Sequence, residues 1–254
     1  MSPEPEHAYG PRVHLVGDAC SHTAPARLGS PGVTHTERLA LVRGLYRGLA
    51  QRAYGAELPT VEAEVPTRMA AVHRERGVFR GRVPDPAARV VVVDVIRGGI
   101  VPAQVCFETL TEVLPVDHIR LDHLNMSRRA DERGRVTGVD PTGSKVGGST
   151  AGATLVLPDP VGATGSTLLR AVEFVAEEHG RPAKVVCLPL IVTPEFLRRS
   201  STGSPKRSST PFGSIGDSPT RTSSRPRPAP SGTGSGAWTS RATSCPGREA
   251  WGRS

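Results

Sequence analysis

Residues 154–175, TLVLPDPVGATGSTLLRAVEFV, contain the pattern that decides the fold. An apolar run at 154–157 meets a Pro-Asp-Pro triplet, and the small residues at 163–167 then lead into an apolar pattern of helical period. This order predicts a strand, a loop and the N-terminus of a helix. Because the first turn of a helix has free N–H groups and the positive end of the helix dipole, the loop is a candidate phosphate site. An ordinary capped turn between a strand and a helix has the same pattern.

The acid beside this loop strengthens the phosphate interpretation. Asp159 stands between Pro158 and Pro160 at the end of the predicted strand. A carboxylate there can accept hydrogen bonds from the hydroxyls of a ribose whose phosphate lies in the loop. Ser166 and Thr167 can each cap the helix and donate a hydroxyl to a phosphate oxygen.

A second candidate anion site follows the run VVVVDVI at 90–96, which predicts a buried parallel strand interrupted only by Asp94. Arg97-Gly98-Gly99 comes next, where glycines allow backbone N–H groups to face a ligand and the arginine adds a cation. The run at 185–192 predicts another buried strand, and strands that alternate with helices indicate a parallel α/β sheet. In such sheets ligands bind beyond the carboxyl ends of the strands, where both candidate sites fall.

The segments around this core are less specific. Residues 1–33 form a poorly defined N-terminal extension whose apolar run at 13–16 suits an edge element. The capping-box spacing of Thr34 and Glu37 predicts the start of a helix. Residues 125–153 are polar and glycine-rich, and their length favours either a lid over a polyanionic substrate or a solvated loop. Cations that such a lid would carry are Arg128, Arg129 and Lys145.

The net charge of +8 comes from the C-terminal segment 198–254, which holds 10 of the 32 basic residues but only 2 of the 24 acidic ones. The first 197 residues are left with 22 of each, and this neutral body argues against a specific nucleic-acid partner. The four cysteines have no paired spacing, which favours free thiols in a reducing compartment. With no signal sequence and no window of membrane-spanning length, we expect a cytoplasmic protein without a membrane partner.

Residues 34–197 resemble uracil phosphoribosyltransferases, which are type I phosphoribosyltransferases. The family's leucine-arginine-alanine-glycine turn corresponds to Ile96-Arg97-Gly98-Gly99, and its phosphate loop DPMLATGGS to DPVGATGST at 159–167. Its methionine-tyrosine-arginine corresponds to Met126-Ser127-Arg128, with Arg129 as the alternative in a shifted register. One acid followed by proline, as in Asp159-Pro160, is typical of the uracil enzymes, whereas most type I relatives carry two adjacent acids.

The resemblance implies a type I phosphoribosyltransferase-like parallel sheet flanked by helices, with a flexible hood or lid and a disordered C-terminal tail. It also implies transfer of phosphoribose from phosphoribosyl pyrophosphate (PRPP) to uracil, giving UMP and pyrophosphate. Mg2+ would bind through the pyrophosphate, with no direct protein ligand. Arg97, Arg128 and Asp159 would be the catalytic residues. The residues that would bind PRPP are Arg97, Gly98, Gly99, Arg128, Asp159, Pro160, Val161, Gly162, Ala163, Thr164, Gly165, Ser166 and Thr167.

Two further expectations rest on the family alone: a homo-oligomer if the C-terminus is intact, and GTP as an effector. Two alternatives stay open. One is a non-catalytic regulator of pyrimidine metabolism on the same fold, which senses nucleotides or binds RNA. The other is a phosphoribosyltransferase for orotate or a purine.

The segment 198–254 departs from the family. Its 57 residues include 14 Ser, 7 Thr, 7 Pro and 8 Gly, and this composition predicts a basic disordered tail, which could bind nucleic acid nonspecifically. The family's uracil-binding segment GYIVPG is missing. With GC-rich codons, a shifted frame over 204–224 permits PQALVYALRLDRGLSDPDVL, and over 234–253 it permits ERGLDEQGYIVPGPGGVGE. Our hypothesis is a frameshift from about residue 200, which predicts weak or absent uracil transfer and reduced stability.

Overall fold

The apolar runs of the sequence form the centre of a parallel sheet in the computed structural model, which describes residues 4–130, 136–141, 143–202 and 209–213. All of these belong to one compact unit, residues 1–217. Six strands lie in the order β1-β10-β9-β8-β4-β5, and each pair of neighbours is parallel. Their bounds are β1 His14–Leu15, β4 Val90–Ile96, β5 Ile119–Asn125, β8 Thr154–Gly162, β9 Lys184–Val192 and β10 Ser209–Gly213. The predicted α/β class is confirmed.

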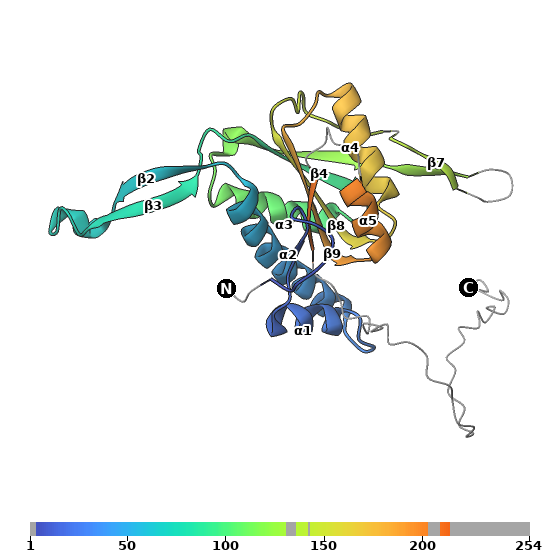
Figure 1. The fold of residues 1–254 in the computed structure, drawn as a ribbon, viewed down its shortest axis with the longest axis horizontal. Helices are drawn as coiled ribbons and strands as arrows, with labels where there is room; N and C mark the ends of the chain where they lie inside the picture. Colours follow the sequence, from blue (N-terminus) through green and yellow to red (C-terminus); the bar gives the residue numbers. More distant parts are fainter. Residues whose placement is uncertain (1–3, 131–135, 142, 203–208, 214–254) are drawn as a thin grey trace, which may run out of the picture. The chain divides into compact units, whose positions relative to one another are not determined.

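Helices cover both faces of the sheet (Figure 1). Helices α2 (His35–Glu57) and α3 (Ile100–Thr111) pack on one face, while α4 (Ser166–Glu178) and α5 (Pro194–Thr202) pack on the other. Val92 of β4 packs into the first core, and Val93 packs into the second. Because both faces are buried, the strand has a continuous rather than an alternating apolar sequence.

The chain leaves β4 and β8 in opposite directions. From β4 it passes through α3 to β5 on one side, and from β8 it passes through α4 to β9 on the other. The connections therefore diverge between β4 and β8, which are direct neighbours in the sheet. Such a switch point opens a crevice at the carboxyl ends of the strands, and both predicted anion sites begin there.

The remaining elements lie around this sheet. Strands β2 (Thr60–Pro66) and β3 (Val78–Pro84) form an antiparallel hairpin that projects beyond the end of α2 (Figure 1). A second hairpin, β6 (Ser127–Ala130) with β7 (Val136–Asp140), belongs to the predicted lid. Helix α1 (Ala19–Leu28) packs against α2. Two short 3-10 helices, η1 (Arg68–Ala71) and η2 (Val116–His118), complete the described elements.

Local signals in the sequence account for several boundaries. The capping box at the start of α2 is confirmed, since Thr34 Oγ1 accepts the Glu37 N–H at 3.2 Å and Glu37 Oε2 accepts the Thr34 N–H at 2.8 Å. The N-terminal apolar run does form an edge strand, β1. Strand β8 is longer than predicted and continues through Asp159 to Gly162, because β9 runs alongside it and Asp159 pairs with Pro189. Helix α4 begins at Ser166, two residues before the predicted start.

Part of the segment predicted to be a disordered tail has regular structure. Helix α5 continues to Thr202, and β10 pairs with β9, with Thr210 opposite Val186. Side-chain pattern does not reveal β10, because parallel pairing uses backbone groups that every residue except proline supplies in full. The rest of the tail, including the positions of the shifted-frame GYIVPG, lies outside the described residues.

Two smaller expectations concern the cysteines and the membrane. The three described cysteines, Cys20, Cys106 and Cys187, are free thiols. None of the described helices combines the length and the apolar character that crossing a bilayer would require.

Candidate functional site

The turn after β4 presents Arg97 and Gly98 to solvent, whereas Gly99 is buried. Gly99 is the N-cap of α3 and makes no side-chain cap hydrogen bond. A β-carbon on Gly99 would lie 2.7 Å from Asp94 Oδ1 and 2.7 Å from the Val95 nitrogen, so no larger residue fits. Arg97 has no ion pair with the described residues. The turn therefore offers a free guanidinium and exposed backbone at the end of the strand, as an anion site requires.

Asp159 lies directly beside this turn. A β-carbon on Gly98 would lie 3.6 Å from Pro160 Cδ and 3.9 Å from Asp159 Oδ1. Burial raises the pKa of Asp159 above the ordinary value of an aspartic acid, and a 3.4 Å hydrogen bond from the Val161 N–H opposes that shift. The structure thus brings together the two predicted segments, one from each side of the switch point.

The loop after β8 ends in a helix whose N-terminus carries no side-chain cap. Gly165 is the N-cap and has a φ of 72°, in the left-handed region that favours glycine. Thr164 Oγ1 lies 2.9 Å from Ser166 Oγ, so both hydroxyls lie at the start of α4. The prediction that Ser166 or Thr167 caps this helix is wrong, because the helix already begins at Ser166. The Ser166 N–H donates to Thr164 Oγ1 at 3.5 Å, and the other first-turn N–H groups keep their capacity to bind an anion.

Residues at the start of α5 pack against this loop and bond to its backbone. A β-carbon on Gly162 would lie 3.0 Å from the Phe196 ring, and one on Gly165 would lie 3.1 Å from it. Phe196 is 2% exposed. Thr193 donates its hydroxyl to the Ala163 carbonyl at 2.5 Å, and its N–H to the Gly162 carbonyl at 3.0 Å. Sequence analysis missed both residues, because nothing in the sequence indicates that Thr193 and Phe196 pack against a loop some 30 positions earlier.

Asp94 is a buried acid beneath the turn after β4. It is 1% exposed, and its Oδ2 lies 3.0 Å from His123 Nδ1 of the neighbouring strand β5. Burial raises the pKa of Asp94, and the hydrogen bond with His123 opposes that shift. The sequence shows Asp94 as the one charge in an apolar run, but it does not reveal the partner, which depends on the register of β4 against β5.

The lid contributes less to the described site. Arg128 and Arg129 lie in β6, whose backbone pairs with β7, and the structure describes no side chains there. Whether either arginine faces the crevice therefore stays a prediction. Lys145 is exposed, and its backbone forms a bridge with His123. This bridge fixes the point at which the lid returns to the sheet.

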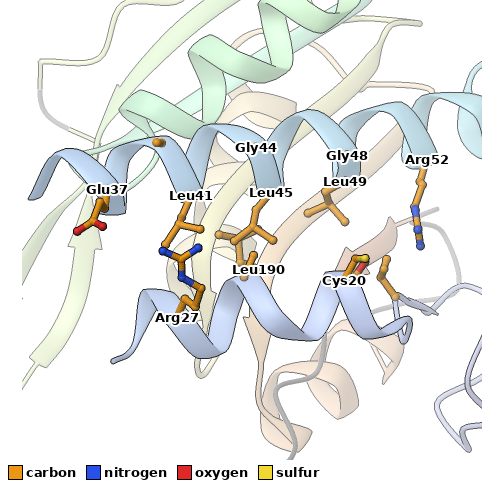
Figure 2. A pocket seen from close by; sticks show the side chains of 14 residues that line it. Cys20, Arg27, Glu37, Leu41, Gly44, Leu45, Gly48, Leu49, Arg52 and Leu190 are labelled. Atoms are coloured by element: carbon orange, nitrogen blue, oxygen red, sulfur yellow. The ribbon is translucent and has the colours of Figure 1, made fainter. Parts of the chain in front are cut away.

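Two cavities are lined by other residues. One, of about 480 Å3, lies between α1 and α2 and is lined by the apolar side chains of Leu41, Leu45 and Leu49 (Figure 2). The other, of about 550 Å3, lies along β5 and is lined by Arg120, His123 and Lys145 among others. Neither is lined by any residue predicted to bind PRPP. The crevice at the switch point is the better candidate, because there the anion-binding features converge.

A magnesium ion fits this arrangement only together with a substrate. The described residues contain no group of three or more His, Cys, Asp or Glu side chains that could hold a metal ion. Mg2+ is usually bound through one or two carboxylates and the phosphates of a substrate, with waters completing its coordination. A phosphate bound at the turn would supply oxygen ligands for the ion, with the Asp159 carboxylate nearby.

A family model and a solved structure from Aquifex aeolicus agree with the fold. The family model for uracil phosphoribosyltransferase matches residues 30–208. Among solved structures, a protein of Aquifex aeolicus aligns with a TM-score of 0.60 at 18% identity, over 80% of this chain and 86% of its own. A purine phosphoribosyltransferase from Pyrococcus horikoshii aligns with a TM-score of 0.38 at 16% identity, over 72% of this chain and 86% of its own. A hypoxanthine phosphoribosyltransferase from Staphylococcus aureus aligns with a TM-score of 0.42 at 11% identity, over 69% of this chain and 73% of its own. Curated proteins gave no match.

Proposed function

The chain belongs to the uracil phosphoribosyltransferase family, and we propose that it transfers phosphoribose from PRPP to uracil, giving UMP and pyrophosphate. The family match spans β4, β5, β8 and β9 of the sheet, the lid segment and both strand ends, while β1 and β10 lie outside it. Phosphoribosyl transfer follows from this membership. Uracil as the acceptor is the finer part of the proposal, and Asp159-Pro160, the acid-proline pair typical of the uracil enzymes, supports it.

The observation that carries the proposal is the closeness of Asp159 to the turn, where a β-carbon on Gly98 would lie 3.9 Å from Asp159 Oδ1. PRPP has a pyrophosphate at C1′ and a phosphate at C5′ of one ribose, so its site needs two anion-binding elements with a hydroxyl acceptor between them. The turn 97–99 and the loop 163–167 leave neighbouring strands, and Asp159 lies against the turn at the start of the segment that leads to the loop. This order along the crevice corresponds to the order of groups in PRPP.

Each part of the site then has a role in the reaction. Cleavage of the bond at C1′ builds positive charge on the ribose and negative charge on the departing pyrophosphate. Arg97 and the turn backbone stabilise the pyrophosphate charge, and Arg128 adds a second cation. Asp159 accepts hydrogen bonds from the ribose hydroxyls and fixes the ring. The loop 163–167 binds the 5′-phosphate with the N–H groups of α4 and the hydroxyls of Thr164 and Ser166.

Mg2+, bound through the pyrophosphate oxygens, would neutralise part of the leaving-group charge. Asp159 and the pyrophosphate held at Arg97 are the groups beside which it would bind. The proposal needs no general base among the described residues, since the chemistry consists mainly of charge stabilisation and positioning.

The C-terminal segment determines how well uracil is recognised. The family match stops at residue 208, close to the position at which the composition changes. This end point supports the frameshift hypothesis, because a shifted frame removes similarity abruptly rather than gradually. In the literal chain we expect PRPP to bind but uracil transfer to be weak or absent. Sequencing the gene tests the hypothesis, and codons that cannot encode GYIVPG in the alternate frame would contradict it.

The proposed function is tested by pyrophosphate release from PRPP and Mg2+, with uracil, orotate, hypoxanthine or adenine as the acceptor. Both the literal chain and a frame-restored chain are assayed. We expect the restored chain to release pyrophosphate only with uracil, and calorimetry to detect PRPP binding to both chains. Turnover with another base would reassign the acceptor. RNA binding by a restored chain without turnover would favour the regulator.

A further inference from the structure

Asp94, beneath the turn after β4, is a buried acid that is only partly hydrogen-bonded among the described residues. Its carboxylate is 1% exposed, and Oδ1 has no hydrogen-bond partner among the described residues. A buried, incompletely paired carboxylate costs free energy, so its presence needs an explanation. The packing of β4 does not supply one, because its other residues are apolar.

The two carboxylate oxygens point to different parts of the site. Oδ2 lies 3.0 Å from His123 Nδ1. Oδ1 lies beneath Gly99, where a β-carbon would come within 2.7 Å of it. Gly99 is the N-cap of α3 and has no side-chain cap, so the carboxylate lies close to the positive end of this helix. Asp94 thus lies under the turn to which we assign the pyrophosphate.

His123 is held in place from two sides. Its ring is hydrogen-bonded to Asp94. Its backbone N–H donates to the Lys145 carbonyl at 3.0 Å, and its backbone carbonyl accepts the Lys145 N–H at 2.8 Å. The side chain is 48% exposed. The titratable and charged side chains that line the same cavity as His123 are Arg120, Asp122, Lys145 and His179, of which Arg120 and Asp122 pair with each other, and Arg97 lies in the turn. His123 is the one that contacts the carboxylate.

These contacts have an electrostatic consequence. A lone carboxylate beneath an anion site weakens anion binding, because the two negative charges repel each other across the turn. An imidazolium bonded to that carboxylate cancels most of its field. We propose that Asp94 and His123 are a positioning pair for pyrophosphate: Asp94 supports the turn and the N-terminus of α3, and His123 supplies the charge that keeps this support compatible with a bound anion. The inference rests on the proposed function, since it needs pyrophosphate at this turn.

The test compares His123→Gln with the double variant Asp94→Asn/His123→Gln. Calorimetry measures the binding of Mg-pyrophosphate at about pH 6.5, where imidazoles carry substantial positive charge. Glutamine keeps a hydrogen-bond donor but not the charge, so we expect His123→Gln to weaken binding about five- to tenfold. Removing the carboxylate charge as well should return the affinity to within about twofold of wild type. A purely structural tie between β4 and β5 predicts the opposite, namely that the double variant is no better than the single one.

Two controls keep the outcome interpretable. His73→Gln, a change at an exposed histidine next to η1, should leave pyrophosphate binding unchanged. Asp94→Asn alone, which keeps the shape and removes the charge, should bind pyrophosphate at least as tightly as wild type, and it serves if His123→Gln does not fold. Weaker binding by Asp94→Asn, or unchanged binding by folded His123→Gln, would overturn the pair's role. A wild-type protein that binds neither pyrophosphate nor PRPP would instead overturn the proposed function.

Discussion

The turn after β4 and the loop after β8 both precede a helix N-terminus, but different side chains lie beneath them. Under the turn lies a buried charge pair, Asp94 with His123. Under the loop lies the apolar ring of Phe196. The positive end of α3 thus already has a carboxylate close to it, whereas the described end of α4 has no acid in its first turn. We infer that the turn depends on the Arg97 side chain to bind an anion, while the loop depends on backbone N–H groups.

Gly165→Ala gives the largest expected effect. A side chain at a φ of 72° is strained, and its β-carbon would lie 3.1 Å from Phe196, so the loop must move. We expect the affinity for ribose 5-phosphate and PRPP to fall about 100-fold, since the loss of two hydrogen bonds to a charged phosphate, at about 1.5 kcal/mol each, costs about 3 kcal/mol. Calorimetry measures both, and pyrophosphate affinity should change little.

The matched control for this variant is Gly32→Ala. Gly32 has a φ of 84° and no atom within 4 Å of the β-carbon position, so it carries the same backbone strain away from the loop. It should lose about 1 kcal/mol of stability and keep its affinity for ribose 5-phosphate. Equal effects of the two variants on ligand binding would show that the loop has no specific role.

Arg97→Gln tests the turn after β4. We expect pyrophosphate affinity to fall about ten- to thirtyfold, because a charge-assisted hydrogen bond contributes about 1.5 to 2 kcal/mol. Ribose 5-phosphate affinity should stay close to wild type, which reverses the pattern of Gly165→Ala. Arg82→Gln is the control, since Arg82 is 72% exposed in the β2–β3 hairpin. A loss of both affinities in Arg97→Gln would mean that the two strand ends do not bind separate anions.

Phe196→Ala removes the ring beneath the loop without changing the loop itself. We expect a loss of about 3 kcal/mol in the free energy of unfolding, together with about tenfold weaker binding of ribose 5-phosphate. Leu197→Ala, at the next position in α5 and equally 2% exposed, should lose comparable stability and bind the ligand almost normally. Urea unfolding and calorimetry measure the two quantities. If both variants lose the same affinity, general destabilisation rather than loop support accounts for the effect.

The same contrast explains what could be predicted from the sequence. The buried run at 90–96, the Gly-rich turn and the 159–167 loop are each a continuous stretch of sequence. Local pattern therefore predicts the strands, a parallel α/β sheet and both candidate anion sites, but not the order of the strands in the sheet. The supports beneath them come from elsewhere in the chain: His123 reaches Asp94 through the register of β5, and Phe196 reaches Gly162 through the packing of α5. Contacts of that kind depend on the assembled fold, and a single sequence contains no local signal for them.

The smallest expected effect concerns pH and Asp159. Burial raises the pKa of Asp159, so the folded protein holds this proton more tightly than the unfolded chain does. Stability therefore falls as the pH rises from the ordinary aspartate pKa of 3.8 through the raised value, because the folded state gives up its favoured neutral form. Asp159→Asn should match wild type at about pH 4 and exceed its stability at about pH 7. Urea unfolding across this range measures the difference.

PRPP binding should strengthen as the pH rises, whereas stability falls, because the ionised carboxylate is the form that accepts hydrogen bonds from the ribose hydroxyls. PRPP affinity of the wild type should fall as the pH drops through the raised pKa of Asp159, whereas Asp159→Asn should bind weakly throughout. Asp117→Asn, at an exposed position in η2, should alter neither profile. A variant that loses stability at neutral pH would mean that the Asp159 carboxylate stabilises the fold. The ribose contact would then not reduce the stability of the fold. Asp159 would have a structural role, as Phe196 does, rather than a ligand-binding role, as Arg97 does.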